Sequence, residues 1–235
     1  IRQQLKPDRK VAILGGSTNV VGIGFLQALL AQGMLADVDG IAVHPYRSVP
    51  EGLEFELDRL EASMEAAGQA RPVWATEFSD DFKRPADAAP FLIKMIAIMS
   101  AVGVERAYWY ALIDQQWYPA MGLFDAGRQT KPAAAAYIAA QTLLLRSGRA
   151  VRLSTDDPLV RLYRFGNGRY VMWGAPRSIS LTAGTAWDSS GAPLSAISSI
   201  GDDPVILSPD AQWTLGSSVV LADTRYQYGT APFAF

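Results

Sequence analysis

One carboxylate, Glu77, stands where it could carry out chemistry on a bound substrate. The apolar run before it, residues 73–76, predicts a short buried strand that delivers Glu77 at its carboxyl end. The preceding strand-like run ends in His44 and Tyr46, and the following one ends in aromatic residues around Trp109. Polar and aromatic side chains at the carboxyl ends of successive strands are the arrangement of an active site on a (β/α) barrel. A glutamate among aromatic residues points to carbohydrate chemistry.

Strand and helix patterns alternate over residues 10–146 and must position these side chains. The patterns predict strands at residues 11–14, 39–44, 72–77 and 104–110, and helices at residues 25–34, 51–67, 87–102 and 131–145. Four such βα units predict a parallel sheet. Because a complete (β/α)8 barrel takes ~250 residues, we expect residues 1–148 to form about half of a TIM barrel.

The pattern changes after Gly148 to short runs that alternate apolar and polar residues. These runs lie at residues 160–165, 169–173, 178–182, 204–207 and 218–221. The turn sequence Gly166-Asn167-Gly168 between the first two is a strong hairpin signal. We therefore expect residues 149–235 to form an antiparallel β-sandwich domain.

Composition narrows the possible functions. The chain is 49% hydrophobic and 19% charged, with a net charge of −2, so there is no basic excess to favour a nucleic-acid partner. The chain has no cysteine and only one histidine, which excludes a metal site with cysteine ligands or with several histidine ligands. We expect no cofactor. No apolar run approaches the ~20 residues of a membrane span.

Several short motifs together resemble a known group of enzymes. They are His44-Pro45-Tyr46, Trp74-Ala75-Thr76-Glu77-Phe78, Tyr108-Trp109-Tyr110, and Met121-Gly122-Leu123 followed by Lys131-Pro132-Ala133. In order and spacing they fit strands six, seven and eight in the barrel of a retaining clan A glycoside hydrolase, so the chain is similar to the second half of such an enzyme, about strands five to eight. With the β-rich segment after residue 148, the chain most resembles the family 39 glycoside hydrolases.

The resemblance implies a role for each of these positions. Glu77 would be the catalytic nucleophile, and His44 and Tyr46 would line the sugar subsite, with the tyrosine bonded to the nucleophile. Trp109 would form a platform under the sugar. Because adjacent side chains of a strand face opposite sides, either Trp109 or its neighbours Tyr108 and Tyr110 can face the substrate, and we favour Trp109. Trp117, in the following loop, could stack on a sugar or anchor the loop. Poly- or oligosaccharides would be the substrates, and a periplasmic or secreted location fits them.

One part of the family's machinery is missing from the sequence. The acid/base glutamate of these enzymes follows an asparagine, and no Asn-Glu dipeptide occurs here. We expect that residue upstream of Ile1, with Asp114 as the best internal substitute. A half-barrel also leaves two open sheet edges, so we expect the missing N-terminal half, or a partner chain, to complete it.

Two other interpretations stay open on the sequence. A half-barrel without a second catalytic carboxylate could be a non-catalytic carbohydrate-binding or regulatory module. The segment Gly15-Gly16-Ser17-Thr18 could bind a phosphate, but it lacks the Lys-Ser/Thr ending of a P-loop. We interpret it as a tight turn that lines the cleft, and we expect Trp74 to face away from Glu77 into the core.

Overall fold

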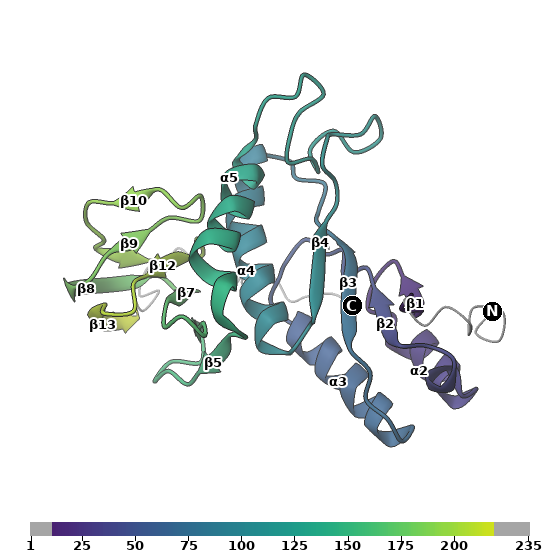
Figure 1. Cartoon of the computed structure of the whole chain (residues 1–235). Helices are drawn as coiled ribbons and strands as arrows, with labels where there is room; N and C mark the ends of the chain where they lie inside the picture. The colour runs from purple at the N-terminus through teal and green to yellow at the C-terminus, as the bar shows by residue number, and fades with distance from the viewer. Residues whose placement is uncertain (1–10, 219–235) are drawn as a thin grey trace, which may run out of the picture.

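A computed structural model describes residues 11–218 and shows a parallel sheet, a layer of helices and a β-rich part (Figure 1). The parallel sheet has four strands in the order β1-β2-β3-β4, each paired in parallel with the next. Its strands are β1 Leu14–Thr18, β2 Gly40–Val43, β3 Val73–Phe78 and β4 Arg106–Trp109. The longer helices are α2 Ile23–Ala31, α3 Leu53–Ala66, α4 Ala88–Ala101 and α5 Pro132–Ala139. The parallel sheet and alternating helices expected from the sequence are therefore present.

The helices differ in how much of their surface is buried, as their sequences indicate. In α3, the side chains that recur at helical spacing, Leu53, Leu57, Leu60 and Met64, are all buried. In α4, by contrast, ten residues are buried, including Lys94. Figure 1 shows the reason, because α4 and α5 stand between the parallel sheet and the β-rich part. A helix that is apolar on nearly every side is one that packs on both sides.

The β-rich part contains two antiparallel sheets. A six-stranded sheet has the order β10-β9-β12-β7-β6-β5, and a three-stranded sheet has the order β11-β8-β13. The strands are β5 Val151–Leu153, β6 Val160–Arg164, β7 Tyr170–Gly174, β8 Arg177–Ala183, β9 Ala186–Trp187, β10 Pro193–Leu194, β11 Ser199–Ile200, β12 Val205–Leu207 and β13 Gln212–Ser218. The hairpin expected at Gly166–Gly168 joins β6 to β7, and Gly168 has a φ of 84°. The strand expected at residues 218–221 lies outside the described residues, apart from its first position.

The two parts of the chain share one hydrophobic core and several ion pairs. The core runs from the parallel sheet through α4 to Tyr163, Phe165 and Trp173 in the β-rich part. The rings of Tyr163 and Trp173 stack, and the Trp173 indole N–H donates to Glu51 at 2.6 Å. Glu54 of α3, buried, accepts a hydrogen bond from Arg161 of β6. The β-rich part is thus fastened to the helix that follows β2.

The first strand departs from the sequence expectation. We expected a tight turn at residues 15–18, but these residues belong to β1: Gly15, Gly16 and Thr18 pair with β2, and the register shifts at Ser17. Glycine makes the close pairing possible, because a Cβ on Gly16 would lie 2.9 Å from the carbonyl oxygen of Ala42, and Gly16 has a φ of 103°. The helix α2 begins only at Ile23, so this segment does not form the helix N-terminal turn that a phosphate site requires.

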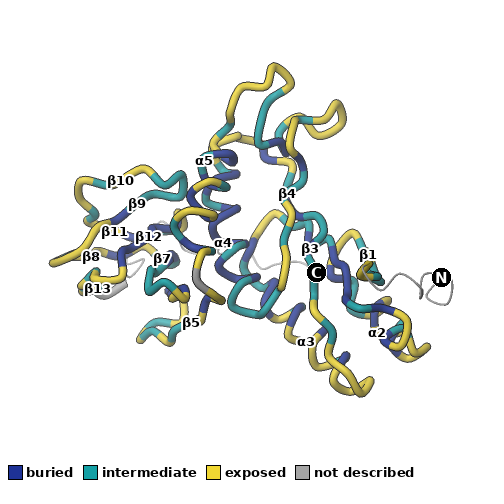
Figure 2. The backbone as a smooth tube through the Cα atoms, viewed as in Figure 1, coloured by how far each residue is buried: buried dark blue, intermediate teal, exposed yellow. Residues whose placement is uncertain are grey.

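The face of the parallel sheet that points away from the helices is open. On β4, Ala107 and Trp109 pack against the core, whereas Arg106 and Tyr108 are exposed. Figure 2 shows this contrast between α4, most of which is buried, and β4, where exposed residues alternate with intermediate ones. Among residues 11–218, no helix is long and apolar enough to cross a membrane.

Candidate active site

Glu77 is directed away from the core by an irregularity at the end of β3. Ala75 and Phe78 are both buried in the core although they are three positions apart, and the pairing with β4 shifts register between them. This bulge breaks the strict alternation of a strand. The side chain of Glu77 is 37% exposed at the carboxyl end of the strand.

The same bulge overturns the expectation for Trp74. Strand alternation placed Trp74 opposite Glu77 and in the core. Instead the guanidinium of Arg106 lies over the Trp74 ring at 4.5 Å, and the ring of Tyr108 lies 6.5 Å away. Arg106 and Tyr108 belong to the open face of the sheet, so Trp74 lies there too.

Tyr46 and His44 both approach the Glu77 carboxylate. The hydroxyl of Tyr46 donates to Glu77 Oε2 at 2.7 Å, and His44 Nδ1 lies 3.6 Å from the same oxygen. Burial raises the pKa of the Tyr46 phenol, and the hydrogen bond to the Glu77 carboxylate raises it further. Tyr46 therefore remains a protonated donor at any ordinary pH. The structure brings these three predicted residues together, and their catalytic roles stay predictions.

Ser17, which we expected only as part of a turn, also lies next to His44. Ser17 Oγ lies 3.4 Å from His44 Nε2, so the histidine stands between a hydroxyl and a carboxylate. Ser17, His44 and Glu77 come from the carboxyl ends of β1, β2 and β3. The signal was present in the sequence, since Ser17 ends a strand-like run as His44 and Glu77 do.

Trp109 does not lie with these residues. Its ring stacks on Phe82 at 5.9 Å and meets Phe78 and Phe91 edge to face, and its indole N–H donates to the carbonyl of Met121 at 2.8 Å. These contacts fix the ring on the helix side of the sheet. Its placement therefore argues against the sugar platform expected of Trp109, because the aromatic rings of the core already cover it.

The tyrosine after Trp109 lies nearer the carboxylate. The ring of Tyr110 meets Tyr46 edge to face at 6.3 Å, and its hydroxyl donates to Gln115 at 2.9 Å. Gln115 and Tyr118 close a tight turn by reciprocal backbone hydrogen bonds. Trp117 lies in this turn and is 79% exposed. An indole displayed on a closed turn is available for stacking, and its role as a sugar contact stays a prediction.

Asp114, the internal candidate for a second carboxyl, is already engaged. Its Oδ1 accepts hydrogen bonds from Lys131 Nζ at 2.6 Å and from the backbone N–H of Gly122 at 2.7 Å. Both charged side chains are 10% exposed. Asp114 therefore holds the loop after β4 to the start of α5. In residues 11–218, no group of three or more histidine and acidic side chains is arranged to hold a metal ion.

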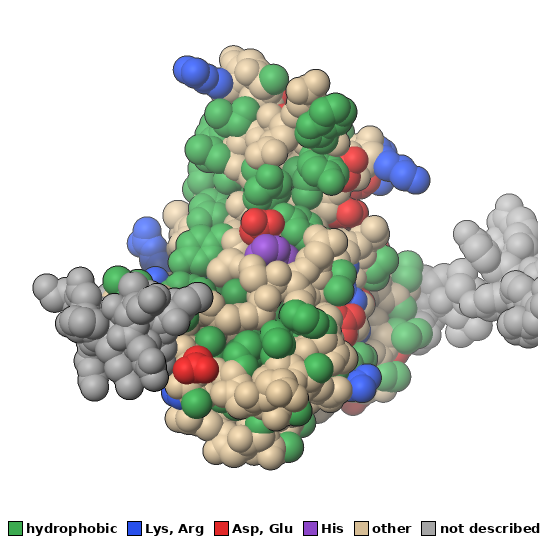
Figure 3. Space-filling view, turned by 90° about the vertical axis from the view of Figure 1, so that its right-hand side faces the viewer, with side chains coloured by type: hydrophobic (Ala, Val, Ile, Leu, Met, Phe, Trp, Pro, Cys, Tyr) green, Lys and Arg blue, Asp and Glu red, His purple; other side chains and the backbone are tan. Residues whose placement is uncertain are grey.

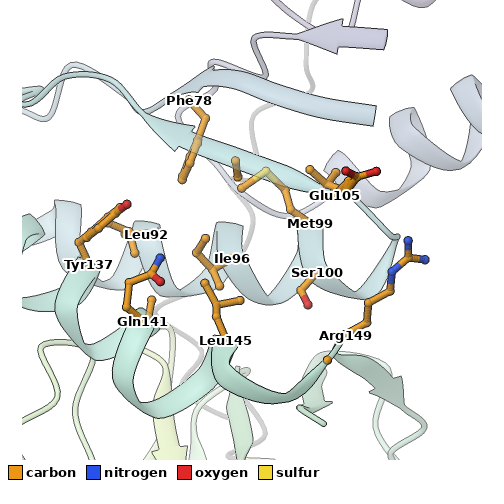
Figure 4. Close-up of a pocket in the computed structure, with 14 residues that line it drawn as sticks. Phe78, Leu92, Ile96, Met99, Ser100, Glu105, Tyr137, Gln141, Leu145 and Arg149 are labelled. Carbon is orange, nitrogen blue, oxygen red and sulfur yellow. The ribbon is translucent and has the colours of Figure 1, made fainter. Parts of the chain in front are cut away.

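The carboxylate lies on an open face, whereas a more enclosed cavity lies elsewhere. Figure 3 shows the face that carries the only histidine of the chain, with hydrophobic side chains above and below it. A cavity of about 280 Å³ lies between β4, α4 and α5 (Figure 4). Its labelled lining residues are Phe78, Leu92, Ile96, Met99, Ser100, Glu105, Tyr137, Gln141, Leu145 and Arg149. This cavity is mainly apolar and has no contact with the Glu77 group, so we place the site at Glu77.

Comparison with known proteins identifies the family. The chain belongs to the glycosyl hydrolase catalytic core family, whose model matches residues 1–137. Among solved structures it is similar to a family 39 glycoside hydrolase from the gut symbiont Bacteroides cellulosilyticus WH2, with a TM-score of 0.68, 17% identity, and coverage of 86% of this chain and 51% of that chain. It is also similar to N2152 from Neocallimastix frontalis, with a TM-score of 0.54, 15% identity, and coverage of 92% and 60%.

At these identities the structural likeness shows the fold. The chain spans about half the length of the family 39 enzyme that it matches. A search of the curated proteins found no match.

Proposed function

We propose that this chain is the C-terminal part of a retaining glycoside hydrolase and that Glu77 is its nucleophile. The observation that carries the proposal is the hydrogen bond from Tyr46 to Glu77 at a strand's carboxyl end, with His44 beside it. Membership of the glycosyl hydrolase family supports the same chemistry. The substrate is an O-glycosidic bond of a poly- or oligosaccharide, and a periplasmic or secreted location belongs to the same proposal.

The mechanism requires two carboxyl groups ~5–5.5 Å apart. Glu77 would attack the anomeric carbon and form a glycosyl-enzyme, while a second carboxyl group protonates the leaving oxygen and then activates water. The hydrogen bond from Tyr46 and the neighbouring His44 ring hold the Glu77 carboxylate in one direction for this attack. Because Asp114 is engaged with Lys131, we place the acid/base residue on a segment outside this chain.

The same proposal covers the architecture. Residues 1–148 would be the second half of a (β/α)8 TIM barrel, strands five to eight, and residues 149–235 a β-sandwich domain. Three observations support a barrel half outside this chain. Within the described residues, β1 and β4 each pair with a neighbouring strand on one side only. Tyr108 on the inner face of the sheet is 46% exposed, and a cavity opens beside β4. A strand added next to β4 would cover both the open edge and the cavity.

Covalent trapping tests Glu77 without needing the acid/base residue. A 2-deoxy-2-fluoro glycosyl fluoride carries a leaving group that departs without protonation, and its C2 fluorine slows hydrolysis of the adduct. We expect one member of a panel of such fluorides to add one sugar to the peptide that contains Glu77. Glu77→Gln should abolish the adduct. Glu105→Gln, a change at the opposite end of β4, should retain it. An adduct on any other residue contradicts the assignment.

A non-catalytic carbohydrate-binding half-barrel is the second candidate. It is favoured by the engagement of Asp114, the internal candidate for a second carboxyl group, with Lys131. This candidate predicts sugar binding by calorimetry with no adduct from any fluoride in the panel. Such a result would replace the enzyme proposal.

The architecture is tested by the state of the chain in solution. The intact mass of the natural protein decides whether an upstream half exists, since this chain alone has a mass of 25.4 kDa. The isolated 235-residue chain should associate with itself or with the missing half, as measured by light scattering. A monomer that unfolds in a single cooperative transition would show that the sheet needs no completion.

A further inference from the structure

Ser17 combines an uncommon backbone conformation with a polar contact at the site. Its φ is 56°, in the left-handed region that residues other than glycine seldom adopt. Such conformations persist where the surrounding structure enforces them, and they cluster at functional sites. Here the conformation accompanies a hydroxyl 3.4 Å from His44 Nε2. A serine has no advantage over glycine at this φ except its side chain.

His44 is held so that each ring nitrogen faces one polar group. Its backbone N–H donates to the carbonyl of Thr18 at 2.9 Å, and its own carbonyl accepts from the Tyr46 N–H at 2.7 Å. The side chain is 18% exposed. With the backbone tied on both sides, the ring spans from Ser17 Oγ to Glu77 Oε2. The two nitrogens cannot exchange neighbours without a ring flip.

The chemistry of these groups determines the direction of the hydrogen bonds. An ionised carboxylate only accepts, so the favourable arrangement of the ring has its proton on the nitrogen that faces Glu77. A neutral imidazole then has an acceptor at Nε2, and the Ser17 hydroxyl is the donor that can satisfy it. Ser17 thereby selects the Nδ1–H tautomer, which is the tautomer that can donate to Glu77.

We propose that Ser17 is a positioning residue for the nucleophile, acting through His44. The inference rests on the proposed function of Glu77. With the tautomer fixed, Tyr46 donates to Oε2 of Glu77 at 2.7 Å and the Nδ1–H of His44 faces the same oxygen at 3.6 Å, so both groups hold that oxygen of the carboxylate. Oε1 is then the oxygen that attacks the anomeric carbon. Holding a reacting atom in a defined direction supplies much of the rate advantage that enzymes gain from positioning.

The tautomer can be measured directly because the chain has a single histidine. Nitrogen-15 NMR of the imidazole in the full-length protein, at a pH where the ring is neutral, should show the Nδ1–H form. Ser17→Ala removes the hydroxyl, and Ser17→Gly removes it while relieving the backbone. Both variants should shift toward the Nε2–H form that predominates in free histidine. An Nε2–H ring in the unaltered protein, or an unchanged tautomer in both variants, overturns the proposal.

The rate of covalent trapping supplies the second readout. In both variants the rate of adduct formation at Glu77 should fall by roughly tenfold or more, since misdirecting a reacting group can cost a hundredfold. Equal losses in the two variants assign the effect to the hydroxyl. A loss in Ser17→Ala that Ser17→Gly restores assigns it to backbone strain and contradicts the proposal. If Glu77 never traps a sugar, the enzyme proposal fails, while the tautomer result still decides the role of Ser17.

Discussion

The ion pair between Glu54 and Arg161 should fix the β-rich part to α3, and breaking it should be costly. The two side chains are 7% and 16% exposed and lie 107 positions apart in the sequence. In Arg161→Met the aliphatic volume is nearly kept, but a buried carboxylate loses its main partner. Arg152 at 3.6 Å, itself 42% exposed, and the N–H of Gly52 at 2.9 Å remain as partial compensation.

We therefore expect Arg161→Met to lower the free energy of unfolding by about 3 kcal/mol, the lower end of the range for breaking a buried pair. Urea unfolding followed by circular dichroism measures the change. Adding Glu54→Gln to Arg161→Met should restore part of the loss, because the uncompensated charge is then absent. Arg84→Met, which removes an exposed partner of Asp87, is the control and should leave the urea midpoint unchanged. A loss below ~1 kcal/mol in Arg161→Met, or a double variant less stable than that single variant, would refute the reasoning.

Three further predictions follow from local geometry. Gly16→Ala should destabilise the fold by about 1–3 kcal/mol because of the φ of 103° at Gly16 and the close carbonyl of the neighbouring strand. Gly24 is exposed in α2 with open space around it, so Gly24→Ala should stabilise the fold by ~0.5–1 kcal/mol. Thermal unfolding of the two variants measures both changes. Tyr46→Phe removes a charge-assisted hydrogen bond of about 1.5–3 kcal/mol, so trapping at the nucleophile should slow by roughly tenfold or more, while Tyr108→Phe should not change the rate. Burial raises the pKa of Glu54, but the hydrogen bond from Arg161, the backbone hydrogen bonds and the attraction to the Arg161 charge together outweigh burial and leave that pKa below its ordinary value. The stabilisation by Glu54 is then complete above the unfolded-state pKa of about 4.3 and is lost as the pH falls through the folded-state pKa, so urea midpoints should drop less on acidification in Glu54→Gln.

The sequence by itself determined the elements and the order of polar groups at their ends. Helical patterns in the sequence located α3 and α4. Each of these patterns depends on neighbours three or four positions away, which a single sequence displays. The sequence also predicted that His44, Tyr46 and Glu77 lie near one another, because parallel strands place their carboxyl ends at one edge of the sheet.

Only the tertiary structure decided which way the side chains at those ends point. The bulge between Ala75 and Phe78 depends on the pairing of β3 with β4, and it places Trp74 on the open face. Trp109 packs in the core because aromatic residues from α4 and from the loop before α4 surround its ring. The contact of Ser17 with His44 arises from the pairing of β1 with β2. The direction of each of these side chains depends on residues distant in the chain, about which local periodicity carries no information. The sequence therefore predicted which residues lie at the strand ends, and the packing between strands determined which side chains surround the carboxylate.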